Sequence, residues 1–127
     1  AFSCTDPFWR FERDRSGFFP RVVCLCGSTR FASEFAHQNL QETLKGHIIL
    51  SIGYDLQNDT LLLCHLSDEK RCEIKAKLDE LHKRKIDLAH EILVLDVDGY
   101  IGASTANEIA YAKCTGKRVR YLSKEHR

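Results

Sequence analysis

The sequence predicts an α/β fold, in which a parallel sheet has helices on both of its faces. Two observations lead to this prediction. First, four short apolar runs have the length and composition of buried strands. They lie at residues 21–26, 47–51, 92–95 and 118–122. Second, segments with apolar residues at helical spacing, rather than hairpin turns, separate these runs, so we expect parallel strands joined by right-handed crossovers.

The first predicted helix, at residues 31–44, follows the first strand. Its inward face is expected to consist of Phe31, Phe35, Ala36, Leu40 and Leu44. Gly46 is expected to end this helix as a left-handed cap. The second strand, at 47–51, follows directly and is expected to be buried.

The second predicted helix, at residues 67–89, is the longest. Ser67 can cap its N-terminus, and charged residues occupy its outer face. Its inward stripe is expected to consist of Ile74, Leu78, Leu81, the stem of Lys85, Ile86 and Ala89.

The third predicted helix follows the strand at 92–95. Ser104 or Thr105 can cap it, and Gly116 is expected to stop it. Ile109 and Ala112 are expected to face inward. The last strand, at 118–122, follows this helix.

Two segments show no clear periodicity. Residues 1–20 mix aromatic and charged side chains, and we expect them to form an N-terminal arm that packs on the domain at 21–127 or on a second subunit. The segment from Gly53 to Cys64 contains turn residues and a short apolar patch. We expect it to form a lid or a substrate-selecting loop.

Size and charge narrow the class of ligand. The 127 residues suit one domain with an ordinary core. The 19 Lys and Arg against 18 Asp and Glu leave a net charge of +1, which gives no reason to expect nucleic acid or an anionic membrane as a partner. No apolar stretch approaches the length of a bilayer span, and the N-terminus lacks the order of a secretory signal. We therefore expect a cytoplasmic protein with a small-molecule ligand.

The six cysteines favour neither a disulfide framework nor a metal site. Cys24 and Cys26 alternate on the first predicted strand, and no C-x-x-C pair occurs. The remaining cysteines stand alone at Cys4, Cys64, Cys72 and Cys114. We expect buried, reduced thiols, although the cysteines alone leave a bridge open.

The loop Gly27-Ser28-Thr29-Arg30 lies where the first strand gives way to a helix. Backbone N–H groups and the helix dipole favour an anion there. Ser28 and Thr29 add hydroxyl groups, and Arg30 adds a positively charged guanidinium group with paired N–H donors. A phosphate group fits this loop. The loop has neither the dinucleotide-binding nor the Walker A pattern. The alternative is that Gly and Ser serve only the backbone of the turn.

Three carboxylates are expected at one edge of the sheet, because Asp96 and Asp98 follow a strand and Glu108 lies early in the next helix. Cleavage of a glycosidic bond needs a carboxylate as nucleophile or charge stabiliser and a second acidic group. The alternatives are that the two aspartates form the turn and that Glu108 complements the helix dipole. His82 is either a solvated residue of the long helix or a catalytic one.

A set of motifs in a fixed order resembles the nucleoside 2-deoxyribosyltransferase-like superfamily, including its nucleoside 5′-monophosphate N-glycosidase branch. The motifs are CGSTRF, GHIILS, KIDLAHEILVLDVDGYIG, STANEIAYA and GKRVRYL, and they span Arg21 to Leu122. The resemblance implies a Rossmann-like or flavodoxin-like domain, a homodimer whose subunits share their sites, and cleavage of an N-glycosidic bond. It also implies that Glu108 is the nucleophile.

The resemblance assigns the phosphate-binding residues as well. Gly27, Ser28 and Arg30 match the loop that holds the 5′-phosphate in the nucleotide hydrolases, and Gly102 and Ser104 match a second loop that assists it.

Two residues depart from the pattern of this superfamily. His82 stands where related enzymes often carry an aspartate, and Asp79, one turn earlier, could substitute for it. Cys24 stands where the nucleotide hydrolases have a tyrosine.

The leading hypothesis is hydrolysis of a nucleoside or deoxynucleoside 5′-monophosphate to free base and sugar phosphate. Glu108 would act on the anomeric carbon, and Asp98 or Asp96 would bind the sugar, with neither metal nor organic cofactor. The alternatives are a nucleoside 2-deoxyribosyltransferase, in which a second base replaces water, and a non-catalytic nucleotide-binding module, which the His82 and Cys24 departures favour.

Overall fold

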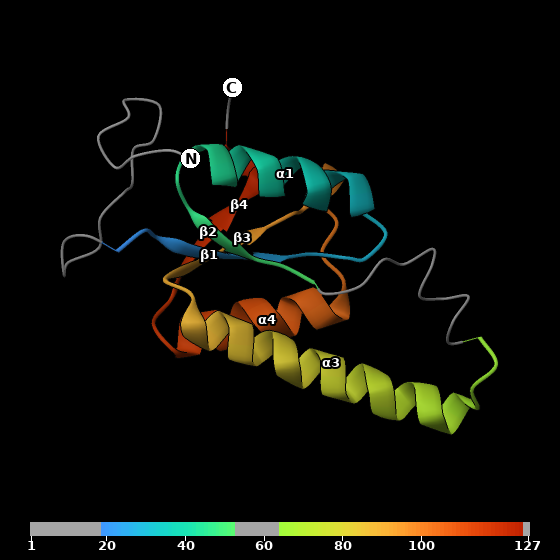
Figure 1. Ribbon diagram of the computed structural model, residues 1–127. Helices are drawn as coiled ribbons and strands as arrows, with labels where there is room; N and C mark the ends of the chain where they lie inside the picture. Colours follow the sequence, from blue (N-terminus) through green and yellow to red (C-terminus); the bar gives the residue numbers. More distant parts are fainter. Residues whose placement is uncertain (1–18, 53–63, 126–127) are drawn as a thin grey trace, which may run out of the picture.

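The computed structural model describes residues 19–52 and 64–125, and it confirms the predicted α/β fold (Figure 1). Four strands form one parallel sheet in the order β2-β1-β3-β4. The strands are β1 (Val22–Cys26), β2 (Ile48–Leu50), β3 (Glu91–Val94) and β4 (Arg118–Tyr121). This is the Rossmann-like or flavodoxin-like arrangement that the sequence predicts. Nearly all of the predicted arm at 1–20 and of the predicted loop at 53–64 lies outside the described residues.

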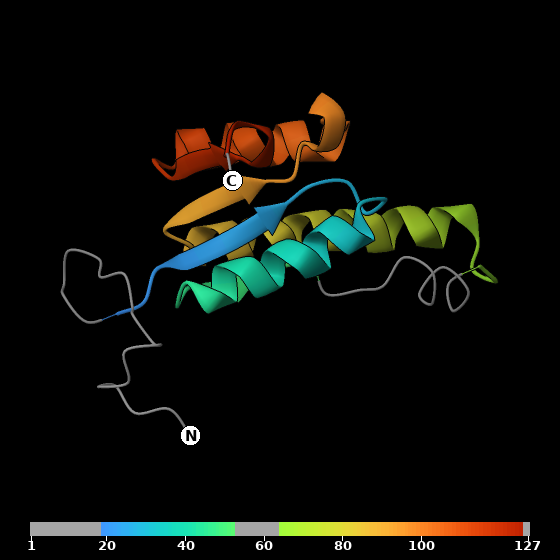
Figure 2. The same cartoon turned by 90° about the horizontal axis from the view of Figure 1, so that it is seen from above.

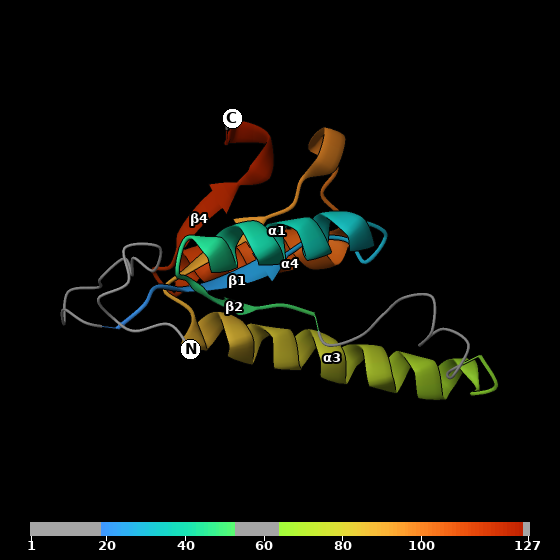
Figure 3. The ribbon, with the colours of Figure 1, turned by 45° about the horizontal axis from the view of Figure 1, so that its top comes forward.

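Helices cover both faces of the sheet. Figure 1 shows α1 (Ala32–Leu44) above the sheet and both α3 (Asp68–Leu88) and α4 (Ala103–Cys114) below it, and Figure 2 gives the view from above. Two short 3-10 turns, η1 (Val97–Gly99) and η2 (Leu122–Lys124), follow β3 and β4. The N-terminal half of α3 extends past the carboxyl ends of the strands (Figures 1 and 3).

The alternation of side chains along the strands divides the core into two parts. On one face Val23, Leu25 and Leu93 pack with Phe35 of α1. On the other face Cys24, Cys26, Ile92 and Val94 pack with residues of α3 and α4, which are Ile86, Ile109 and Ala112. Because β1 and β3 lie in the middle of the sheet, every residue of both strands is buried.

Three predictions about burial are wrong. The second strand is not buried, because β2 lies at the edge of the sheet and Ile48 is 40% exposed. Ala36, Leu40 and Leu44 of α1 are also exposed. The inward face of α1 instead carries Phe35 and Glu42, which are two helical turns apart. Leu81 of α3 is exposed as well, because the adjacent residue His82 takes the buried position.

Three of the four helix ends predicted from capping residues and glycines are confirmed. The Ser67 side chain caps α3 by accepting a hydrogen bond of 3.1 Å from the backbone N–H of Lys70. Gly46 and Gly116 follow α1 and α4 with positive φ angles of 89° and 77°. The prediction that Ser104 or Thr105 caps α4 is wrong, since Gly102 is the N-cap and both side chains lie inside the first turn.

None of the helices in the described ranges combines the length and the apolar composition that a membrane span requires.

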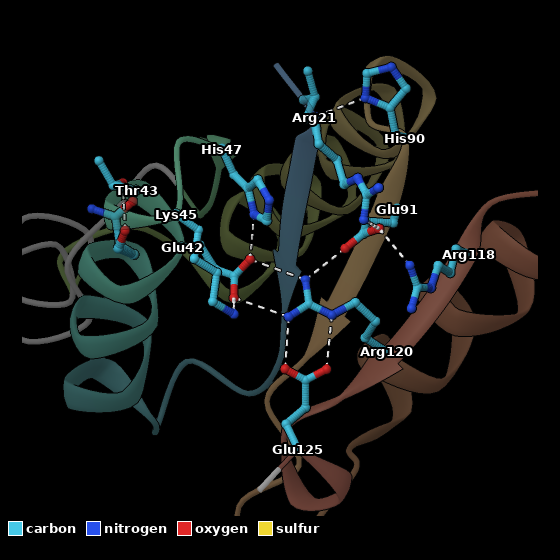
Figure 4. Close-up of polar contacts among 12 residues, drawn as sticks. Arg21, Glu42, Thr43, Lys45, His47, His90, Glu91, Arg118, Arg120 and Glu125 are labelled. Carbon is cyan, nitrogen blue, oxygen red and sulfur yellow. Dashed lines mark hydrogen bonds and ion pairs between the residues drawn. The ribbon is translucent and has the colours of Figure 1, made fainter. Parts of the chain in front are cut away.

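A network of buried and half-buried charges surrounds Arg120 of β4 (Figure 4). Its guanidinium donates to both carboxylate oxygens of Glu42 at 3.1 Å and to both oxygens of Glu125 at 2.9 and 2.7 Å. It also donates to Glu91 of β3 at 2.6 Å. Paired hydrogen bonds of this kind offset the cost of burying the charges. The network therefore links α1, β3, β4 and the end of the described chain.

Glu42 makes the stability of the fold depend on pH. Burial alone raises the pKa of the Glu42 carboxyl, but hydrogen bonds from Arg120, His47 and Lys45 outweigh burial and lower this pKa from 4.5 to about 2. A carboxyl whose pKa is lower in the folded state stabilises the fold above its unfolded pKa. This stabilisation is lost as the pH falls from 4.5 to about 2.

We predict that Glu42→Gln removes much of this acid sensitivity. At pH 7 the variant should be less stable by on the order of 3 kcal/mol, because Arg120 loses a buried charged partner. The difference should shrink toward pH 2, where Glu42 is protonated. Urea unfolding followed by circular dichroism across this pH range measures the effect. Glu73→Gln, on the exposed part of α3, is the matched control and should follow the wild type. An unchanged pH profile in Glu42→Gln would contradict the prediction.

Candidate functional site

The candidate site lies at the carboxyl edge of the sheet, on the right in Figure 1. The two central strands end together there, because the backbone N–H of Leu95 donates to the carbonyl of Cys26 at 2.8 Å. The loop 27–30 after β1 and the loop 96–102 after β3 therefore begin side by side. Helix α4 also begins at this edge. This is the edge at which open parallel sheets bind ligands.

His82 of α3 is buried at the centre of the site, with 6% of its surface exposed. Its Nε2 atom lies 3.6 Å from the Sγ of Cys24 and 3.4 Å from the Sγ of Cys26. The same atom lies 3.9 Å from Oε1 of Glu108 on α4. His82 is therefore not on a solvated helix face, and it joins β1, α3 and α4 at one point.

These four side chains change one another's ionisation. A hydrogen bond from Cys26, together with His82, lowers the pKa of Cys24 to about 6, although burial opposes this. The pKa of Cys26 is raised by the neighbouring Cys24 sulfur and by burial. Burial lowers the pKa of His82, but the Cys24 sulfur and the Glu108 carboxylate outweigh it and raise this pKa. The arrangement favours an imidazolium between negative groups.

Glu108 is the most accessible member of this cluster, with 12% of its side chain exposed. Burial raises the pKa of its carboxyl, while the charge of His82 and a hydrogen bond with Cys26 act in the opposite direction. Cys26 immediately precedes Gly27, so Glu108 lies beside the start of the loop that the sequence predicts to bind phosphate.

A second set of polar contacts extends from Glu108 along α3 and α4. Lys75 donates to the Ser104 hydroxyl at 3.0 Å and forms an ion pair with Asp79 at 3.2 Å. Ser104 and Glu108 are one turn apart and share a face of α4. The negative charge of Asp79 also contributes to raising the pKa of Glu108.

The loop after β1 is linked to the loop after β3 by Arg30. Its guanidinium stacks over the ring of Tyr100 at 4.3 Å and donates to the Tyr100 hydroxyl at 3.3 Å. Within the first loop, the Ser28 hydroxyl accepts a hydrogen bond of 3.3 Å from the backbone N–H of Arg30. Thr29 is half-buried in the same turn. In the loop after β3, Gly102 lies against the side chain of Tyr100.

The two aspartates are not brought together with Glu108 in the way that the sequence predicts. Asp96 is buried, and its carboxylate accepts hydrogen bonds from the backbone N–H and the hydroxyl of Ser123, at 2.9 and 2.6 Å. It therefore fixes η2 to the end of β3. Asp98 is exposed and has a positive φ of 54°, next to Gly99 with a φ of 80°. This geometry agrees with the alternative that Asp98 forms the turn.

Four residues of the site were not predicted as site residues. Cys24 and Cys26 could have been found, because residues two apart on a strand share a face. Lys75 could also have been found, because Lys75, Asp79 and His82 have helical spacing. No sequence signal indicated Tyr100, whose role depends on Arg30, which lies 70 residues earlier in the chain.

The cysteines are only partly as predicted. Cys24 and Cys26 are buried, but Cys64, Cys72 and Cys114 are exposed.

Comparisons with known protein families, with curated proteins and with solved structures find no match for this chain.

We predict that Gly27 cannot be replaced without loss of stability. A Cβ atom at this position would lie 3.1 Å from Cβ and 3.3 Å from the carbonyl oxygen of Leu95, which is itself buried. Gly27→Ala should therefore cost about 1–3 kcal/mol of unfolding free energy. Gly102→Ala is the comparison variant and should lose less, since its Cβ would meet only the Tyr100 side chain, at 3.3 Å, and alanine is merely a poorer N-cap of α4 than glycine. Chemical unfolding measures both variants, and equal losses would contradict the importance of the Gly27–Leu95 contact.

Proposed function

We propose that the protein hydrolyses the N-glycosidic bond of a nucleoside or deoxynucleoside 5′-monophosphate. The observation that carries this proposal is the position of Glu108. Its partly exposed carboxylate lies 3.9 Å from the buried His82 and beside the end of β1, where the loop 27–30 begins. A carboxylate and an anion-binding loop at one sheet edge are the two groups that such a substrate requires.

Glu108 is the proposed nucleophile. One of its oxygens forms a bond to the anomeric carbon while the bond from that carbon to the base breaks, and the base leaves with the electron pair and takes up a proton. Water then cleaves the sugar ester, which releases the sugar phosphate and restores the carboxylate. His82 is a positioning residue, because its charge holds the Glu108 carboxylate in place.

The loop 27–30 is proposed to hold the 5′-phosphate. The Arg30 guanidinium has five N–H donors, and its hydrogen bond to Tyr100 uses one of them. Stacking on the Tyr100 ring fixes the plane of the guanidinium, which reduces the entropy lost when it binds a phosphate. The N-terminus of α1, which follows this loop, adds a favourable dipole.

A homodimer remains a prediction from the superfamily resemblance.

We predict base release from nucleoside 5′-monophosphates that depends on Glu108. Purified protein is incubated with ribo- and deoxyribonucleoside 5′-monophosphates and with the matching nucleosides, and free base is measured by chromatography. Glu108→Gln and Glu108→Ala should each reduce the rate at least about a hundredfold. Glu73→Gln, an exposed glutamate on α3, should leave the rate unchanged.

Other outcomes of this assay distinguish the alternatives. Acceleration by a second base, with formation of a new nucleoside, would indicate a deoxyribosyltransferase. No base release across the panel, with a second base also present, would favour a non-catalytic nucleotide-binding module. Full activity of Glu108→Ala would show that the nucleophile is assigned wrongly.

We also predict that Arg30 makes the protein bind nucleoside 5′-monophosphates more tightly than the matching nucleosides. Arg30→Ala should raise the KM for 5′-monophosphates about tenfold to a hundredfold, which corresponds to the loss of a charged hydrogen bond, and should leave the KM for nucleosides nearly unchanged. Arg71→Ala is the matched control, because Arg71 is exposed near the start of α3. An equal rise in KM for both kinds of substrate would contradict a phosphate contact.

A further inference from the structure

Three metal-ligating side chains converge beneath the sheet edge. The Sγ atoms of Cys24 and Cys26 and the Nε2 atom of His82 all lie within 4.8 Å of one another. The two thiols come from β1, and the imidazole comes from α3. All three residues are buried, with exposed fractions of 0%, 0% and 6%. Elements far apart in the sequence therefore bring together two sulfur donors and one nitrogen donor.

The distances from the imidazole nitrogen to the two sulfur atoms match those around a tetrahedral zinc ion. With Zn–S bonds of about 2.3 Å and Zn–N bonds of about 2.0–2.1 Å, a tetrahedral angle separates the sulfur and nitrogen ligands by about 3.6 Å. The observed separations from His82 Nε2 are 3.6 Å to Cys24 and 3.4 Å to Cys26. The position of His82 relative to each thiol therefore already suits a shared ion, and the two sulfur atoms lie within 4.8 Å of each other.

Glu108 can complete the coordination. Its Oε1 lies 3.9 Å from His82 Nε2, whereas a carboxylate oxygen and an imidazole nitrogen on one zinc ion are about 3.3 Å apart. A shortening of this distance by roughly half an ångström would bring the two atoms to the spacing of ligands on one ion. The 12% exposure of the Glu108 side chain gives the cluster contact with solvent, from which an ion or a water ligand can come.

A disulfide is a poor alternative for this pair of thiols. Residues two apart on a strand have Cα atoms about 6.6 Å apart, which is close to the upper limit for a disulfide.

We propose that Cys24, Cys26 and His82 form a binding site for a thiophilic divalent metal ion such as Zn²⁺, with Glu108 or water as the fourth ligand. On binding, the thiols lose their protons to the solvent, and the two thiolates balance the charge of the ion. This proposal differs from the expectation of a metal-free protein, and it does not depend on the glycosidase activity.

Cobalt provides the decisive probe. The reduced protein is freed of metal with a chelator and titrated with Co²⁺ under anaerobic conditions. We expect one equivalent of Co²⁺ to give the visible bands of a tetrahedral ion and a thiolate charge-transfer band with the intensity of two thiolates. Added Zn²⁺ should remove both signals by displacing the cobalt. The wild-type spectrum alone thus counts the sulfur ligands, whether or not the variants fold.

The variants identify the ligands. Cys24→Ser and Cys26→Ser should each weaken Co²⁺ binding at least about tenfold and halve the charge-transfer intensity of any ion that remains bound. His82→Asn should weaken binding to a similar extent but keep the signal of two thiolates. The exposed-thiol variants Cys72→Ser and Cys114→Ser are the matched controls and should behave as the wild type. Circular dichroism checks that each variant is folded.

Two results would overturn the metal site. One is the lack of a tetrahedral cobalt spectrum in the reduced wild-type protein. The other is a spectrum that persists in a folded variant with both Cys24→Ser and Cys26→Ser, which would place the ion on the remaining cysteines. Base release is measured on protein freed of metal and depends on neither result, so failure of the metal site and failure of the proposed hydrolase are distinguishable.

Discussion

The parallel pairing of β1 with β3 is the constraint on which the rest of this structure depends. It aligns Cys26 with Val94, and the hydrogen bond from Leu95 to Cys26 carries the pairing to the ends of both strands. Gly27 then leaves the sheet in close contact with Leu95, which no larger residue could make without displacement. Because parallel strands end at the same edge, both following loops and the start of α4 lie together there.

The two buried polar clusters lie on opposite faces of this sheet and differ in chemistry. The cluster around Arg120 combines a guanidinium, which stays charged at all ordinary pH values, with carboxylates whose oxygens accept its paired hydrogen bonds. Such a cluster suits a structural role. The cluster around His82 contains the histidine itself and the Cys24 thiol, whose pKa is lowered to about 6, and both can gain or lose a proton near neutral pH. This second cluster therefore has the chemistry of a reactive or metal-binding site.

The sequence predicted the elements better than the contacts between them. Hydrophobic periodicity and local signals such as Ser67 and Gly116 located the strands, the helices and most of their ends, because these features depend on neighbouring residues. Burial of Glu42 could not be predicted, since its partner Arg120 is 78 residues away. Burial of His82 likewise depends on thiols 56 and 58 residues away. Glu108 lies at the carboxyl edge of the sheet, as predicted. Asp96 accepts a hydrogen bond from Ser123 and does not line the site beside Glu108.

His82 also connects the two proposals for this site. Its Nε2 atom has one position for a proton or a metal ion, and this same atom faces Cys24, Cys26 and Glu108. With a proton there, the imidazolium attracts the Glu108 carboxylate and holds it near the loop 27–30. With a metal ion there, the proton is absent, and Glu108 either binds the ion or loses its charged neighbour. If both proposals hold, metal binding and the state that positions Glu108 for attack on a sugar are therefore mutually exclusive.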